Sequence, residues 1–257
     1  MSWVKFSVGL CLCALVMSAP AARAATTTPP PVKLFLLGDS ITYQAMQVAP
    51  LTAGLTAAGY APTTLAVKGY PGYLIDGTNV GSPAAGLYEN LPTIMDTPGV
   101  NSANTYILLN VGVNDVEKNF LLGEHQVRYR MNRLIEAVRG YAPLAHIIVG
   151  TIIPNLRDGR DERVRKFNAD ILPVLTGPNL TWVDMYGPFQ PDPSPYMYLG
   201  TDKMHPTQAG HDLIAAAWLG GIQAIAPTPA PEPGVLALIG VAGPSLFSRR
   251  ARRRATL

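Results

Sequence analysis

Cysteine is nearly absent from this chain of 257 residues, and both copies lie close together near the N-terminus. Cys11 and Cys13 fall within the first 24 residues. That stretch has the pattern of a removable targeting segment, so we expect the processed protein to contain no cysteine. A disulfide framework is thereby excluded for the processed chain, and its stability must come from a hydrophobic core.

Residues 1–24 resemble a secretory signal peptide. Lys5 makes the start basic, residues 8–17 are apolar, and Ala22-Arg23-Ala24 fits the small-x-small pattern of a signal peptidase site. The apolar run is too short to span a bilayer comfortably. The alternative is a buried N-terminal helix. We expect cleavage by signal peptidase and export of the protein.

Long hydrophobic runs are scarce, and one near the C-terminus ends in a basic cluster. Residues 226–233 form a proline-rich linker that ends in Pro231-Glu232-Pro233. Residues 234–257 combine a short, mainly apolar stretch with five arginines, which is typical of a stop-transfer anchor whose basic end stays in the cytoplasm. The arginines are Arg249, Arg250, Arg252, Arg253 and Arg254.

The order of these tail features resembles the C-terminal Pro-Glu-Pro sorting signal of exported bacterial proteins, which an exosortase-type enzyme processes. The short apolar stretch, weakened by Pro244, favours a transient membrane anchor. A plain disordered basic tail is the alternative. We expect a protein of the cell surface or the extracellular space.

An excess of basic charge is absent from the middle of the chain. Seven of the 20 Lys and Arg residues lie in the first 24 residues or in the terminal cluster, and none of the 17 acidic residues does. Residues 25–248 therefore carry 13 bases against 17 acids. A nucleic-acid interface needs clustered Lys and Arg, so we expect no nucleic-acid partner.

Residues 32–225, preceded by a threonine- and proline-rich segment over residues 25–31, show apolar runs that alternate with stretches of helical character, and no repeat is visible. Alternating strands and helices predict one domain with a parallel sheet covered on both faces. The predicted fold class is α/β: a three-layer α/β/α, five-stranded, parallel, doubly wound (flavodoxin-like) fold. Strands are expected at 32–37, 63–67, 106–111, 146–152 and 181–184, and helices at 48–58, 124–141, 160–175 and 206–224.

Three short motifs carry the groups of an ester-cleaving serine hydrolase. They are Gly38-Asp39-Ser40-Ile41-Thr42, Gly112-Val113-Asn114-Asp115 and Asp202-Lys203-Met204-His205-Pro206. The first two follow predicted strands and the third precedes the last predicted helix, so all are expected at the carboxyl edge of the sheet. Together they supply a nucleophile, an amide donor and a general base with its carboxylate.

Each residue of this site has an expected role and an alternative. Ser40 is the predicted nucleophile, with a helix N-cap as the alternative. His205 is the predicted base, oriented by Asp202. The predicted oxyanion donors are the backbone N–H groups of Ser40 and Gly72 and the side-chain amide of Asn114. Gly72 is preferred over Gly69, Asn114 has a turn residue as its alternative, and Asp115 is expected to be structural.

A metal site has one weak candidate. His211 follows His205 by six residues, and two histidines at this spacing raise the question of a metal pair. We expect His211 instead to be a solvent-facing residue of the last helix. No metal and no cofactor is predicted, because serine, histidine and amide groups suffice for ester hydrolysis.

The four sequence blocks around Ser40, Gly69–Gly72, Asn114 and His205 resemble those of the SGNH hydrolases, also called GDSL esterases/lipases. The resemblance covers about residues 33–218 and implies Ser40, Asp202 and His205 as the triad. Finer features are similar to carbohydrate esterase family 3, which includes acetylxylan esterases. They are Gly-Tyr-Pro-Gly-Tyr-Leu-Ile-Asp at 69–76, Asn-Val-Gly-Val-Asn-Asp at 110–115, Phe167-Asn168 and Val183-Asp184-Met185.

The resemblance implies an exported serine esterase that hydrolyses short acyl esters, acetyl in particular, on a carbohydrate or another small ester. A lipase or lysophospholipase of the same fold is the alternative. A non-catalytic carbohydrate-binding surface protein is a third reading, and the complete set of Ser40, Asn114, Asp202 and His205 argues against it.

Overall fold

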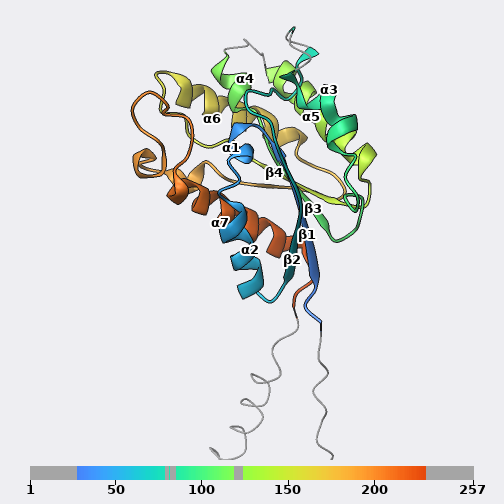
Figure 1. Ribbon diagram of the computed structural model, residues 1–257. Coiled ribbons are helices and arrows are strands. Elements are labelled where there is room, and N and C mark those ends of the chain that lie inside the picture. The colour runs from blue at the N-terminus through green and yellow to red at the C-terminus, as the bar shows by residue number, and fades with distance from the viewer. Residues whose placement is uncertain (1–27, 79–80, 82–84, 119–123, 230–257) are drawn as a thin grey trace, which may run out of the picture. The chain divides into compact units, whose positions relative to one another are not determined.

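The computed structural model describes residues 28–78, 81, 85–118 and 124–229 (Figure 1). Residues 29–230 form one compact unit. The predicted signal peptide and the predicted sorting tail lie outside the described residues. Within the described ranges, no helix combines the length and apolar character that a membrane crossing requires.

Five parallel strands form a single sheet in the order β2-β1-β3-β4-β5. This confirms the predicted five-stranded parallel fold, and each predicted strand is present within two residues at both ends. β3 is buried at every position, whereas the edge strand β2 is partly exposed. The bounds are β1 Pro31–Gly38, β2 Ala61–Gly69, β3 Thr105–Asn110, β4 His146–Gly150 and β5 Leu180–Val183.

The predicted helices are present, and three short helices lie outside the predicted ranges. These are α1 (Ser40–Tyr43), α3 (Leu87–Ile94) and α4 (Val113–Glu117), which are too short to show a clear helical period in the sequence. The predicted helix over 160–175 ends earlier, at Ile171, and continues as a 3-10 turn that contains Pro173. The helices are α1 Ser40–Tyr43, α2 Val48–Ala57, α3 Leu87–Ile94, α4 Val113–Glu117, α5 Glu124–Tyr141, α6 Arg160–Ile171 and α7 Gln208–Ile225. The 3-10 helices are η3 Leu172–Val174, η4 Gly187–Phe189 and η5 Ser194–Tyr196.

Helices cover both faces of the sheet (Figure 1), and a layer of buried apolar side chains lies on each face. Successive side chains of a strand point to opposite faces. Leu34 and Leu36 of β1 therefore pack in the layer with α2 and α7, whereas Phe35 and Leu37 pack in the layer with α3, α5 and α6. In the first layer α2 and α7 lie side by side, with Gly54 against Leu219. This is the three-layer arrangement that the sequence predicts.

The carboxyl ends of β1 and β3 lie next to each other, where the strand order reverses direction. Gly38 and Asn110 are paired in register at this point. A Cβ on Gly38 would lie 2.1 Å from the carbonyl oxygen of Asn110, so only glycine permits this close approach. The chain segments that follow these two residues carry Ser40 and Asn114. In a doubly wound sheet this switch point is where ligands bind.

Candidate active site

In the turn after β1, the residue that caps the following helix is Asp39, so the hydroxyl of Ser40 is not used as a cap. Asp39 is the N-cap of α1, and its Oδ1 accepts a hydrogen bond of 3.0 Å from the N–H of Ile41. Asp39 is fully buried, and this burial raises its pKa to about 7 although backbone hydrogen bonds, that of Ile41 first, act to lower it. Because Asp39 caps the helix, the alternative role for Ser40 as the N-cap is wrong.

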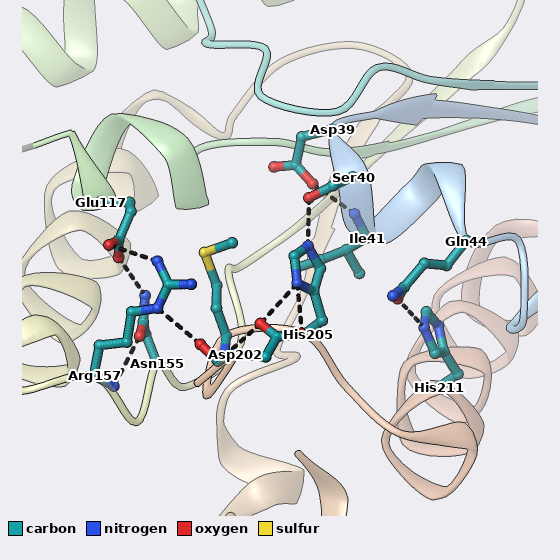
Figure 2. A network of polar contacts seen from close by, with 11 residues as sticks. Asp39, Ser40, Ile41, Gln44, Glu117, Asn155, Arg157, Asp202, His205 and His211 are labelled. Carbon is teal, nitrogen blue, oxygen red and sulfur yellow. Dashed lines mark hydrogen bonds and ion pairs between the residues drawn. The ribbon is translucent and has the colours of Figure 1, made fainter. Parts of the chain in front are cut away.

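Ser40, His205 and Asp202 form a continuous chain of hydrogen bonds (Figure 2). Ser40 Oγ lies 2.8 Å from His205 Nε2, and His205 Nδ1 lies 2.9 Å from Asp202 Oδ1 and 3.1 Å from Oδ2. Burial acts to raise the pKa of Asp202, but its hydrogen bonds and charge interaction with His205 outweigh burial and lower it. A charged Asp202 accepts the Nδ1 proton, which leaves Nε2 free to accept the Ser40 proton.

The turn that carries Asp202 and His205 is closed on itself. Asp202 Oδ1 accepts the N–H groups of Met204 and His205 at 3.3 Å. Lys203 has a φ of 54°, in the left-handed region that a residue with a side chain rarely adopts. The N–H of Lys203 donates to Tyr198 O at 3.0 Å, and the N–H of Tyr198 donates to His205 O at 2.9 Å. The turn thus holds carboxylate and imidazole in one orientation.

Asn114 lies in the short helix α4 and reaches the loop that contains Gly72. Its Nδ2 donates to Tyr73 O at 3.0 Å, and the residue is almost fully buried. An amide nitrogen has two hydrogens, so the second remains available for another acceptor. Lys118, the C-cap residue of α4, also holds this loop, because its Nζ donates to Gly72 O at 3.0 Å.

The two candidate glycines of this loop have different surroundings. Gly72 has a φ of 80°, and a Cβ there would meet no atom within 4 Å. A Cβ on Gly69 would lie 2.1 Å from the backbone nitrogen of Tyr43, so Gly69 is packed against α1. The space beside the Cα of Gly72 is therefore open, whereas the space beside Gly69 is filled by α1.

Asp115 is structural, in agreement with the prediction. It forms a buried ion pair with Arg130 of α5, and its Oδ2 accepts the N–H of Ile75 at 3.2 Å. Arg130 is fully buried, and it lies three residues after Val127 and four before Leu134, on the buried face of α5. Burial lowers the pKa of Arg130 to about 10, and Asp76 and Glu89 act against this shift. The pair anchors the Gly72 loop to the core.

The prediction for His211 is wrong. The residue is fully buried, and its Nε2 lies 2.8 Å from Oε1 of Gln44, the C-cap of α1. The sequence contains the signal, because Ile214, Ala215 and Trp218 follow at helical spacing and share its buried face. In the described part of the chain, no group of three or more His, Cys, Asp or Glu side chains is placed to hold a metal ion.

Two residues beside the triad were missed by the sequence analysis. Arg157 follows β4, and its Nε donates to Asp202 O at 2.8 Å (Figure 2). Its Nη1 donates to Oε1 of Glu117, in α4, at 2.7 Å. The sequence signal that could have identified Arg157 is its position alone, since polar residues after β4 must lie at the same edge of the sheet as those after β1 and β3.

An open hollow of about 380 Å³ lies beside this segment. Most of its lining side chains are polar or charged, and Arg157 is one of them. The other lining residues with polar or charged side chains are Asn155, Asp158, Asp161, Glu162 and Gln190.

A hydroxyl bonded to an imidazole that is bonded to a carboxylate, at the carboxyl edge of a parallel sheet, defines the site of a serine hydrolase. The sequence profile of the GDSL-like Lipase/Acylhydrolase family matches residues 36–213. The chain belongs to this family, and it is a carboxylic ester hydrolase.

Solved structures of similar fold include several esterases. A family 3 carbohydrate esterase from Clostridium thermocellum has a TM-score of 0.59 at 19% identity, over 77% of this chain and 100% of that one. An acetylxylan esterase from Geobacillus stearothermophilus has a TM-score of 0.54 at 19% identity, over 76% of this chain and 95% of that one. A lipase/acylhydrolase from Enterococcus faecalis has a TM-score of 0.56 at 18% identity, over 78% and 100%. No curated protein matches the chain significantly in sequence.

Proposed function

We propose that this protein removes short acyl groups, acetyl in particular, from esters of carbohydrates. The observation that carries the catalytic part is the hydrogen-bonded chain from Ser40 through His205 to Asp202. In this mechanism Ser40 Oγ attacks the ester carbonyl while His205 Nε2 takes the hydroxyl proton. Asp202 stabilises the imidazolium, and His205 then gives the proton to the departing alcohol.

The acyl group remains on Ser40 until water replaces it. His205 takes a proton from that water, which attacks the acyl carbonyl, and the acid leaves as Ser40 regains its proton. In both steps the carbonyl oxygen becomes negative. The N–H groups of Ser40 and Gly72 and the second amide hydrogen of Asn114 are the proposed donors to this oxygen.

A carbohydrate substrate is supported by the polar hollow that Arg157 lines, because the same arginine contacts the acid-base turn, residues 202–205, through the carbonyl of Asp202. Asp161, Glu162 and Gln190 offer hydrogen-bond partners to an alcohol with several hydroxyl groups, whereas a long acyl chain prefers an apolar groove. The sequence features shared with carbohydrate esterase family 3 point the same way. Because a lipase/acylhydrolase has a similar fold, lipase activity is the second candidate function.

The deciding experiment is a series of p-nitrophenyl esters of rising acyl length, run beside acetylated xylan. We expect kcat/KM to be highest for acetate and to fall with chain length, and acetate to be released from xylan. Ser40→Ala is the control, and its kcat should fall by about five to six orders of magnitude. A preference for long chains would replace this proposal by the lipase reading.

Export is proposed from the sequence of the two ends. Residues 1–24 are a signal peptide that signal peptidase removes. Residues 234–257 first anchor the chain in the membrane and are then a sorting signal for an exosortase-type enzyme. The catalytic domain over residues 32–225 then acts at the cell surface or outside the cell.

A further inference from the structure

The acid-base turn is held from outside by the segment that follows β4. Arg157 Nε donates to the backbone carbonyl of Asp202 at 2.8 Å, and the N–H of Leu156 donates to the carbonyl of Lys203 at 2.9 Å. These two bonds reach consecutive carbonyls of the turn, at the residue with left-handed backbone and the one before it. They therefore oppose rotation of the peptide that sets the position of the Asp202 carboxylate.

Glu117 fixes the direction of the Arg157 guanidinium. Glu117 Oε1 accepts Nη1 of Arg157 at 2.7 Å, and its Oε2 accepts Nδ2 of Asn155 at 3.1 Å. Asn155 is fully buried, and its Oδ1 accepts the N–H of Arg157 at 3.0 Å. The carboxylate, amide and guanidinium thus form a closed set of bonds around one segment (Figure 2).

This set joins the two halves of the active site. Glu117 lies in α4, three residues after Asn114, and Arg157 reaches the turn with Asp202 and His205. Burial acts to raise the pKa of Glu117, but hydrogen bonds from Arg157 and Asn155 and the charges of Arg157 and Arg160 lower it. Glu117 is thus charged at neutral pH and attracts the guanidinium.

We propose that Arg157 is a positioning residue of the hydrolase, which aligns the Asp202–His205 turn with the oxyanion donors of α4 through Glu117. The guanidinium suits this role because its planar fork donates in two directions at once, which an ammonium on a flexible stem does not. The inference rests on the proposed function, since it assigns a role in that same reaction.

The test compares Arg157→Ala with Arg160→Ala as the matched control. Arg160 Nε lies 3.5 Å from the same Glu117 carboxylate, so both variants remove one positive charge from it. Of these two arginines, Arg157 alone donates to the carbonyl of Asp202. Because a misalignment of about 1 Å can cost 100-fold, we expect Arg157→Ala to lower kcat for p-nitrophenyl acetate roughly 10- to 100-fold at unchanged KM. Arg160→Ala should stay close to wild type.

Two further measurements separate positioning from folding and from substrate binding. Dilute guanidinium chloride should restore part of the turnover of Arg157→Ala, relative to equal sodium chloride. Glu117→Gln keeps the shape of the side chain and should lower kcat less than Arg157→Ala. The double variant Glu117→Gln/Arg157→Ala should be no slower than Arg157→Ala alone, because both changes act through one contact.

The outcomes are distinct. Equal kcat for wild type and Arg157→Ala, or independent losses in the double variant, would overturn the inference. A loss confined to KM would place Arg157 in substrate binding at the hollow that it lines. If Arg157→Ala does not fold, a wild-type kcat for Glu117→Gln overturns the coupling to α4. A wild-type protein without esterase activity would instead refute the proposed function.

Discussion

Nε2 of His211 lies 2.8 Å from Oε1 of Gln44, so the last helix of the fold is bonded to the short helix that begins at Ser40. The backbone N–H of Gln44 donates to Ser40 O at 3.2 Å. Gln44 therefore connects His211 to the candidate nucleophile through one residue. The side-chain oxygen of Gln44 accepts, so the proton of a neutral His211 lies on Nε2.

Stability should depend on pH through His211. Burial first, together with the charge of His205, lowers its pKa from 6.5 to about 4, and Asp212 opposes this shift. The unfolded chain then binds more protons between these values, so the free energy of unfolding falls as pH drops from 6.5 to 4. The slope from one group is at most about 1.4 kcal/mol per pH unit. In urea titrations, His211→Gln should lack this component, and an unchanged slope would contradict the assignment.

Asp39 should produce the opposite slope. Its folded pKa of about 7 lies above the ordinary 3.8, so the folded state binds more protons between these values and loses stability as pH rises through them. Asp39→Asn keeps a capping side chain and removes the titration. We expect the variant to gain stability relative to wild type from pH 4 to pH 7. Urea midpoints over this range measure the difference, and a constant offset would show that Asp39 is charged throughout.

Asn114→Ala should lower kcat about 100- to 1,000-fold with little change in KM, because the amide acts mainly on the transition state. Steady-state kinetics with p-nitrophenyl acetate measure both constants. Asn101→Ala is the control, since Asn101 accepts the N–H of Leu144 on an exposed loop. A change in KM alone would move Asn114 from the oxyanion site to substrate binding.

A chain truncated to residues 25–226 should be soluble and as active as the full sequence, since the described fold closes with α7. The protein isolated from its host surface should lack the terminal arginines if the tail is processed. Intact-mass measurement decides this point. A mature species that still ends at Leu257 would refute processing and leave a membrane anchor.

Much of the fold was predictable because its strands are apolar and its turns carry glycine. The residues around Ser40 and His205 were predictable for a similar reason, since Asp202 and His205 are three residues apart and meet within one turn. Position at the carboxyl edge of the sheet then placed the motifs near each other. These inferences use local pattern and general topology only.

The remaining contacts depend on partners that are distant in sequence. Arg130 looks like a surface residue until the fold brings Asp115 against it. Glu117 and Arg157 follow different strands and are 40 residues apart. His211 shows a further limit, because its helical spacing indicates burial, whereas histidine as a residue type is intermediate between buried and exposed. In each case a polar side chain is buried only because the tertiary structure supplies its hydrogen-bond partner.

Ser40 and His205 are 165 positions apart, and they belong to the first and last parts of the fold. Asp202 and His205 can meet within a local turn, whereas Ser40 meets His205 only across the folded domain. Closing a contact over so many residues costs more chain entropy than closing a turn. Ester cleavage therefore requires the first and the last parts of the fold to be packed together. Return of activity after dilution from denaturant reports recovery of this long-range contact.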